Sequence, residues 1–408
     1  MHISTSGTER QPSPAAFNAR FALMVMTSLF FIWGFITALN DILLPYLKNA
    51  FSLTYFQAGL VQFCFFGAYF IVSPFAGRFL EKIGYKKGIV VGLLTIASGC
   101  VLFYPAAEIS MYPLFLFALF VLASGVTMLQ VSANPYVAVL GPESTAASRL
   151  NLAQAINSVG HTAGPMFGAL LILAATSEAG SAKSVQTPYL IIAGALVIVA
   201  LLFLKMKLPN ISEHVEKDQA PPPFSLFAHK HLYLGVLAIF LYVGAEVSIG
   251  SYLVNLFMQL GIDNMNEVTA GKMVSYYWGA AMVGRFIGAA ILNFIKATTL
   301  LAINAVLAIG MIVIAVNMEG SLAMWSILAV GFFNSIMFPT IFTLAIRGLG
   351  EYTGRGSGYL CQGIVGGAIL PLLQGIAADA MGLQMSFLIP AISYLYIAWY
   401  AVKGSKIN

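Results

Sequence analysis

Charged residues are scarce in this chain, since Asp, Glu, Lys and Arg together make up 9% of its 408 residues. Soluble domains carry about 25% charged residues, so a soluble fold of this size is excluded. Hydrophobic residues make up 59% of the chain, and they form long continuous runs rather than the short alternating strands of a β-barrel. The composition therefore predicts an all-α membrane protein with many spans.

Cysteine and histidine are also few, with three and five residues respectively. The cysteines, Cys64, Cys100 and Cys361, all fall inside apolar runs, which is typical of small core residues. No spacing of His, Cys or Glu matches a metal site or a nucleophile–base pair. We therefore expect no cofactor, no structural metal and no enzymatic activity, and the positive net charge does not indicate a nucleic-acid partner.

Twelve apolar segments are long enough to cross a bilayer, which takes roughly 20 residues in a helix. A polar stretch that contains the run Pro221–Pro223 divides them six and six. We expect an N-terminal six-helix bundle at 1–206, a cytoplasmic linker at 207–229 and a C-terminal six-helix bundle at 230–408. The predicted spans lie near 21–47, 56–78, 87–105, 111–139, 148–174, 187–206, 230–260, 270–294, 298–316, 321–347, 356–379 and 383–402.

The distribution of Lys and Arg predicts the orientation. With both termini in the cytoplasm, all of the 20 Lys and Arg residues face inside except Lys48, Lys183 and Lys272. The opposite orientation would invert this bias, which membrane proteins favour on the cytoplasmic side. We therefore expect a multi-pass protein with both termini in the cytoplasm, and its expected location is the bacterial inner membrane.

The two halves of the chain share spaced features. Gly77-Arg-Phe79 recurs as Gly284-Arg-Phe286 at an offset of 207, and the intramembrane acid Asp41 has a counterpart in Glu246 at an offset of 205. Two duplicated six-helix halves are the organisation of secondary transporters, which bind their substrate at mid-membrane between the halves.

The loop after the second span carries glycine and charges that suit a conformational latch between the two bundles. The alternative is an ordinary positively charged cytoplasmic loop. The stretch from Gly77 to Lys87 resembles the loop signature of the major facilitator superfamily, with Glu81 where Asp is more common. The predicted latch residues are Gly77, Arg78, Glu81, Lys86 and Arg285.

One carboxylate, Asp41, lies inside the first apolar run, next to Asn40. A charge in mid-membrane costs about 2.5 kcal/mol or more, so it must be paired, hydrated or protonated. Asp41 is therefore a candidate for binding a coupling cation, together with Asn40. The alternative is an acid near a helix end that reaches water, since Pro45 and Lys48 follow closely.

Amides and aromatic side chains recur in several spans. Gln130 and Asn134 are four residues apart and share one helix face, and a similar ladder follows in the fifth span. Amides bind adjacent hydroxyls and rings pack on the C–H face of a sugar. The alternatives are polar contacts between helices and aromatic belt or core residues. The predicted substrate-binding residues are Gln130, Asn134, Asn151, Gln154, Asn157, Glu246, Tyr277, Trp278, Asn334 and Gln362.

Several motifs carry a closer resemblance. Asn40-Asp41, Ser132-Ala-Asn-Pro-Tyr-Val137, Leu140-Gly-Pro-Glu-Ser144 and Arg149-Leu-Asn-Leu-Ala-Gln-Ala-Ile-Asn157 are similar to the fucose–galactose–glucose–hexuronate:cation symporters. The stretch from Tyr242 to Ser251 resembles the glucose/galactose transporter branch. The resemblance implies the major facilitator fold, uptake of a hexose and symport with H+ or Na+.

The resemblance also implies a role for Asp41, which occupies the family's coupling-acid position. Gln130 stands where the fucose permease carries a Glu, so one titratable group is missing, and this tilts the expected ion slightly towards Na+. L-Fucose or another sugar with H+ is the alternative substrate pair. A multidrug antiporter is disfavoured because no Lys or Arg is expected in mid-span. The expected partners are a hexose, the cation and the lipid bilayer, with the protein acting as a monomer.

Overall fold

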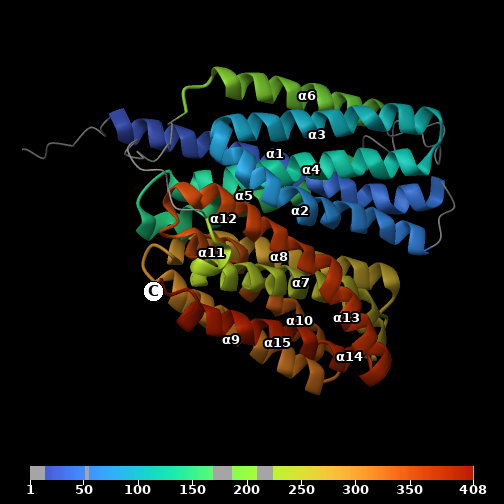
Figure 1. Cartoon of the computed structure of the whole chain (residues 1–408). Helices are drawn as coiled ribbons and strands as arrows, with labels where there is room; N and C mark the ends of the chain where they lie inside the picture. Colours follow the sequence, from blue (N-terminus) through green and yellow to red (C-terminus); the bar gives the residue numbers. More distant parts are fainter. Residues whose placement is uncertain (1–13, 51–54, 169–185, 209–223, 408) are drawn as a thin grey trace, which may run out of the picture.

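The structure is a computed structural model of the whole chain. It describes all residues except 1–13, 51–54, 169–185, 209–223 and 408, and it describes no side chains at 14–18, 39–50, 55–59 and 165–168. The described residues form helices, turns and short connections, and no strand occurs among them. The helices run roughly parallel in two groups, with α1 to α6 in one and α7 to α15 in the other (Figure 1).

The first group consists of six helices. They are α1 (Pro14–Ala50), α2 (Tyr55–Ile83), α3 (Tyr85–Glu108), α4 (Tyr112–Val139), α5 (Ala146–Gly168) and α6 (Gln186–Lys205). Their bounds agree with the six predicted spans to within a few residues at most ends, and α1 begins earlier than expected. The predicted linker lies mostly outside the described residues.

The second group begins with three continuous helices, α7 (Lys230–Gln259), α8 (Glu267–Ile291) and α9 (Ala297–Asn317). The last three crossings are each divided, which the apolar runs did not predict. They consist of α10 (Gly320–Asn334) with α11 (Met337–Ile346), α12 (Thr353–Gln362) with α13 (Gly366–Met381), and α14 (Leu383–Ser386) with α15 (Leu388–Trp399).

Ten of the described segments are long and apolar enough to cross a membrane. The other two crossings are α5 and α8, which carry more polar side chains and pack against each other between the two groups. A helix that faces a polar interior can dispense with an apolar surface on that side. The twelve crossings expected from the sequence are therefore confirmed, and the two least apolar ones lie at the centre.

Glycine allows α5 to approach α1 closely. A Cβ atom on Gly34 would lie 2.0 Å from the carbonyl oxygen of Asn157, and one on Gly160 would lie 2.1 Å from that of Phe31. The Asn157 amide also donates to the Phe30 carbonyl at 2.9 Å. Small residues permit such backbone contact in membrane helices, and here the contact fixes which face of α5 points to the centre.

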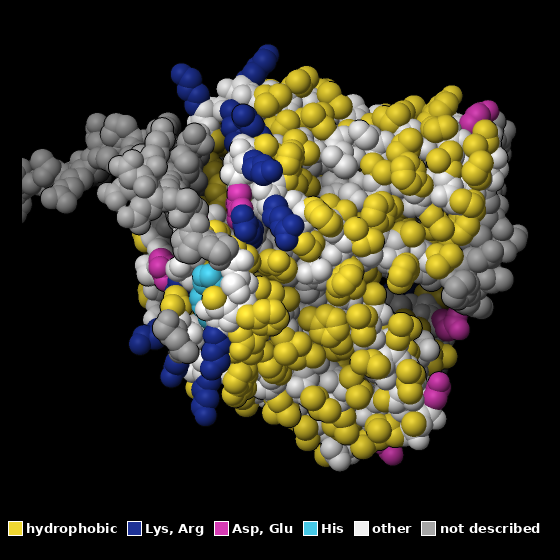
Figure 2. Space-filling model, viewed as in Figure 1, with side chains coloured by type: hydrophobic (Ala, Val, Ile, Leu, Met, Phe, Trp, Pro, Cys, Tyr) yellow, Lys and Arg dark blue, Asp and Glu magenta, His cyan; other side chains and the backbone are white. Residues whose placement is uncertain are grey.

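Several of the contacts between the two groups lie at one end of the molecule. Lys and Arg side chains gather at that end, beside the C-terminus, next to a broad hydrophobic belt (Figure 2). There Arg355 at the start of α12 pairs with Glu81 near the end of α2 at 2.7 Å. Ser148 of α5 donates to the Ala289 carbonyl of α8 at 2.6 Å. We refer to this end as the basic end.

Gly34→Ala tests the contact between α1 and α5. The added methyl group meets the Asn157 backbone, and overpacking of this kind costs about 1–3 kcal/mol, so we expect a clear drop in melting temperature in detergent. Gly310→Ala is the matched control, because nothing lies within 4 Å of its added Cβ in α9. Equal melting temperatures for the two variants would contradict the close contact.

Candidate functional site

A cavity of about 900 Å³ lies between the two groups of helices. Both groups contribute walls, from α1, α2, α4 and α5 on one side and from α7, α8, α11 and α13 on the other. Its polar lining residues are Thr37, Gln62, Gln130, Gln154, Asn157, Ser158, His161, Thr162, Glu246, Ser251 and Arg285. Its aromatic lining residues are Trp33, Phe63, Phe65, Phe66, Trp278 and Phe338.

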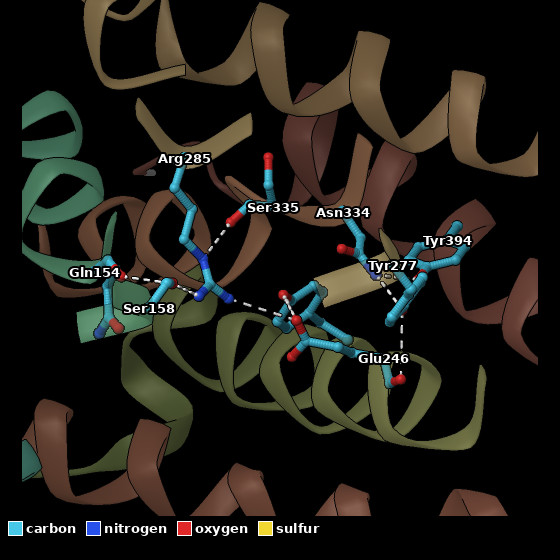
Figure 3. A network of polar contacts seen from close by, with 9 residues as sticks. Gln154, Ser158, Glu246, Tyr277, Arg285, Asn334, Ser335 and Tyr394 are labelled. Carbon is cyan, nitrogen blue, oxygen red and sulfur yellow. Dashed lines mark hydrogen bonds and ion pairs between the residues drawn. The ribbon is translucent and has the colours of Figure 1, made fainter. Parts of the chain in front are cut away.

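Arg285 is the centre of the polar network in this cavity (Figure 3). Its Nη2 lies 3.5 Å from Oε1 of Glu246, and both side chains are largely buried, with 16% and 13% of their surface exposed. Its Nη1 donates to the Ser158 hydroxyl of α5. The guanidinium therefore neutralises the cavity's described carboxylate and joins the two groups of helices.

A proline explains the third contact of Arg285. Its Nε donates to the Ser335 carbonyl at 3.2 Å, in the break between α10 and α11. In a continuous helix that carbonyl would accept from the residue four positions later, which is Pro339 and has no N–H. Arg285 supplies the missing donor, as buried backbone groups in a membrane require.

The Ser158 hydroxyl can bond to Gln154 and to Arg285 at the same time. Its hydroxyl donates to the Gln154 carbonyl one turn earlier at 2.9 Å, which leaves the oxygen free to accept from Arg285. A hydroxyl is both a donor and an acceptor. Among the described residues, the hydrogen bond of Arg285 to the first group of helices therefore depends on one side chain of α5.

Glu246 is held by a second set of side chains behind the cavity wall. Tyr242 donates to Oε1 of Glu246 at 2.8 Å, and Tyr277 donates to the Glu246 backbone carbonyl at 3.4 Å. Asn334 donates to the hydroxyls of Tyr277 and Tyr394 at 2.7 and 3.3 Å. The three tyrosines and Asn334 are buried, so they fix the carboxylate from behind.

The opposite wall is formed by amides. Gln154 donates to Asn134 at 3.3 Å, and Gln130 donates to the Tyr69 hydroxyl at 2.5 Å. Each contact uses one donor and leaves the amide oxygen and a second N–H for other partners. Gln130, Gln154 and Asn157 all line the cavity, so this wall contributes amide groups as well as apolar side chains.

The structure separates the predicted substrate-binding residues into two sets. Gln130, Gln154, Asn157, Glu246 and Trp278 line the cavity. The others do not, and they are Asn134, Asn151, Tyr277, Asn334 and Gln362.

These other residues make structural contacts instead. Asn134, Tyr277 and Asn334 lie behind the lining. Asn151 donates to Ala147 and Thr340, and Gln362 donates to the Phe70 carbonyl of α2 at 3.1 Å. For Asn134 and Asn151 the prediction rested on helical spacing, which does not distinguish a side chain that lines the cavity from one that packs beside it. The side chains of Asn40 and Asp41 lie outside the described residues.

Only some of the predicted latch residues lie between the two groups of helices. Gly77 lies against α12, where a Cβ would be 2.7 Å from the Gly354 carbonyl, and Glu81 pairs with Arg355 across the two groups. Lys86 instead donates to the carbonyls of Leu204 and Met206 at 2.8 Å. It therefore caps the end of α6 within its own group.

Arg78 and Arg285 also depart from the latch interpretation. Arg78 lines a separate groove formed by α2, α3 and α4. Arg285 requires a correction, because it belongs to the cavity wall and not to a helix end. Its Gly-Arg-Phe context copies the loop motif at Gly77, which suggested a loop position. The α8 helix continues to Ile291, and Glu246 provides the partner that a buried Arg needs.

Sequence reasoning also missed Ser158 and the cavity-lining position of His161. The signal was present, because both lie on the polar face of α5 with Gln154, at helical spacings of four and seven residues. The expectation that no Arg lies in mid-span is wrong for Arg285. Glu246 balances its charge, so this pair adds no net positive charge to the described lining of the cavity.

Comparison with known proteins gives a consistent result. Residues 22–364 match the family profile of the Major Facilitator Superfamily. The chain is 55% identical to the glucose/galactose transporter of Brucella abortus, over 95% of both chains. It is 47% identical to a putative glucose/galactose transporter of Helicobacter pylori, over 94% of this chain and 97% of that one.

Solved structures agree with the fold. Crystal structures of FucP, the fucose:proton symporter of Escherichia coli, match with a TM-score of 0.86, and with 0.87 for FucP in the outward conformation. Sequence identity to FucP is 36%, and the match covers 94% of this chain and 98% of FucP.

The buried pair of Arg285 and Glu246 should contribute to the stability of the protein. Arg285→Gln leaves Glu246 without its counter-charge, which costs about 3–5 kcal/mol for buried pairs, so the melting temperature in detergent should fall sharply. Arg285→Gln combined with Glu246→Gln should recover most of this loss. The control is Arg347→Gln, because its pair with Glu143 is exposed and such pairs contribute about 0–1 kcal/mol. A double variant no better than Arg285→Gln would refute the pairing.

Proposed function

The chain belongs to the Major Facilitator Superfamily, and we propose that it imports a hexose of the glucose/galactose type by symport with a cation. The observation that carries this proposal is the cavity between the bundles, where amides face a neutral Arg–Glu pair and aromatic rings. The names of its relatives, which are glucose/galactose transporters and a fucose:proton symporter, support the same substrate class.

The lining chemistry suits a monosaccharide. Gln130, Gln154 and Asn157 offer both donors and acceptors, which match adjacent hydroxyls. Trp33 and Trp278 supply flat apolar surface for the C–H face of a pyranose ring. A volume of about 900 Å³ is within the range of small-molecule sites and leaves room for bound water.

The charges of the cavity favour Asp41 as the coupling acid. Glu246 is neutralised by Arg285, and Gln130 is an amide, so neither is a free acid. Asp41, with Asn40 beside it, is the intramembrane acid that remains for cation binding. A proton would bind and leave the carboxylate directly, whereas Na+ would add neutral oxygen ligands. Because the relative FucP is a proton symporter, the uptake experiment below compares H+ with Na+.

The positive-inside rule places the basic end in the cytoplasm, together with both termini and the 207–229 linker. The contacts between Glu81 and Arg355 then close the cytoplasmic side, and the cavity faces the outside. The likeness to FucP in the outward conformation supports this state. Import proceeds when the bundles 1–206 and 230–408 rock about the bound sugar and open these contacts.

Alternative functions fit less well. L-Fucose is a 6-deoxyhexose that would use the same amides, and it presents one hydroxyl fewer than glucose or galactose. A multidrug antiporter would need a wide apolar or net-charged pocket, and the described lining is neutral and rich in amides. Family membership and the named relatives indicate a transporter rather than an enzyme.

Gln154→Ala tests the sugar site. Loss of one amide that binds hydroxyls removes about 0.5–1.5 kcal/mol, so the KM for glucose or galactose uptake should rise several-fold while the protein stays folded. Asn304→Ala in α9 is the matched control, since its amide bonds only to the carbonyl of its own helix at Leu300 among the described contacts. A KM unchanged in the Gln154 variant would exclude this amide from the site.

Asp41→Asn tests the coupling assignment. In proteoliposomes, labelled glucose and galactose uptake should be driven by a Na+ gradient or by a pH gradient, tested separately, and the variant should lose gradient-driven accumulation. Exchange of labelled for unlabelled sugar without a gradient should survive, which shows that the variant still binds sugar. Accumulation that persists in Asp41→Asn would remove Asp41 from coupling, and absence of hexose flux under both gradients would refute the substrate class.

A further inference from the structure

A second, shallower cavity of about 460 Å³ lies on the outer surface of the first bundle, between α2, α3 and α4. Its walls are mainly apolar and include Val72, Phe75, Phe79 and Met128. Phe75 and Phe79 are exposed over 65% and 44% of their surface. The groove therefore faces the surroundings of the bundle and does not communicate with the central site.

Some polar side chains of the groove have hydrogen-bond partners among the described residues, and others have none. The hydroxyls of Thr95 and Ser124 donate to carbonyls of their own helices, at Val91 and Phe120, so they leave the floor largely apolar. Arg78 and Lys82 also line the groove. They lie one helical turn apart, and neither forms a hydrogen bond or ion pair with any residue that the structure describes.

The place of the groove along α2 indicates what could bind to it. The groove lies near the end of α2 that reaches the basic end, where the hydrophobic belt gives way to Lys and Arg (Figure 2). This is the level at which lipid acyl chains meet their headgroups. Basic side chains at that level attract anionic lipids by about 1 kcal/mol each, and an apolar groove below them offers a surface for one acyl chain.

We propose that this groove is a binding site for an anionic phospholipid. The acyl chain lies along Val72, Phe75 and Phe79, and the phosphate diester binds between Arg78 and Lys82. The guanidinium of Arg78 suits two phosphate oxygens at once, and the ammonium of Lys82 adds a point charge. The inference concerns the surface of α2 and does not rest on which sugar or ion is transported.

The lipid site shares its helix with the contacts that close the basic end. Residues turn by about 100° each along a helix, so Gly77 and Glu81 project to one side of α2, and Phe75, Phe79 and Lys82 to the opposite side. The first side contacts α12 through Gly354 and Arg355. A lipid seated on the second side therefore holds α2 in the position that keeps this contact closed.

Native mass spectrometry of the full chain in detergent tests the binding. Palmitoyl-oleoyl phosphatidylglycerol should be retained more strongly than the phosphatidylcholine with the same chains. Arg78→Gln with Lys82→Gln should weaken the retained phosphatidylglycerol roughly 30-fold. The control pair is Lys403→Gln with Lys406→Gln, two exposed cations at the same end outside the groove, which should leave retention unchanged.

A second variant separates the groove from its charges. Thr95→Phe fills the floor between α2 and α3 and keeps both cations, so it should also reduce phosphatidylglycerol retention. Hydrogen exchange by mass spectrometry should show slower exchange at 77–83 and 350–358 with phosphatidylglycerol than with phosphatidylcholine, in the unmodified chain only. Equal retention of the two lipids, or retention unaffected by the Arg78/Lys82 double variant, would overturn the proposal.

Discussion

The need to neutralise a buried charge organises the centre of this protein. Arg285 is largely buried between the two groups of helices, where Glu246, Ser158 and the Ser335 carbonyl use its donors. Each partner comes from a different element, and Tyr242 in turn holds Glu246. The same residue also donates to the Ser335 carbonyl at the break after α10, which Pro339 leaves without its usual backbone donor. One cation thus fixes the relative positions of α5, α7, α8 and α10.

The contacts of Arg285 also differ in which bundle they join. The pair with Glu246 and the bond to Ser335 lie within the second bundle, whereas the bond to Ser158 crosses to the first. In the proposed rocking motion, the Ser158 bond is the one that can change between the bundles, and the ion pair can stay intact. The buried charge stays neutral throughout such a motion, so alternating access does not carry the cost of exposing an uncompensated charge to an apolar surrounding.

Much of the fold could be predicted from the sequence, because membrane spans follow from length and apolar composition alone. Apolar runs predicted the twelve crossings, and helical spacing predicted the amide-bearing faces of α4 and α5. The divided crossings were not, since their apolar runs are continuous and only contacts such as that of Arg285 with Ser335 reveal the break. Asn134 was predicted to bind substrate because helical spacing gives it a face in common with Gln130, but the depth of a side chain on that face depends on neighbouring helices. Arg285 was misplaced because a short motif copied from a loop does not specify its new surroundings.

The number of unpaired carboxylates that can bind a cation limits how far the proposed symport can concentrate sugar in the cell. Glu246 is neutralised where it lies, and Gln130 cannot titrate, so the proposal leaves Asp41 to carry one cation for each sugar. A membrane potential contributes about 2.3 kcal/mol per elementary charge at 100 mV, which corresponds to a sugar gradient of roughly 50-fold. An ion gradient adds to this. A carboxylate at Gln130 would offer a second charge and a steeper dependence on voltage, and its replacement by an amide favours hydrogen bonding to the sugar over additional driving force.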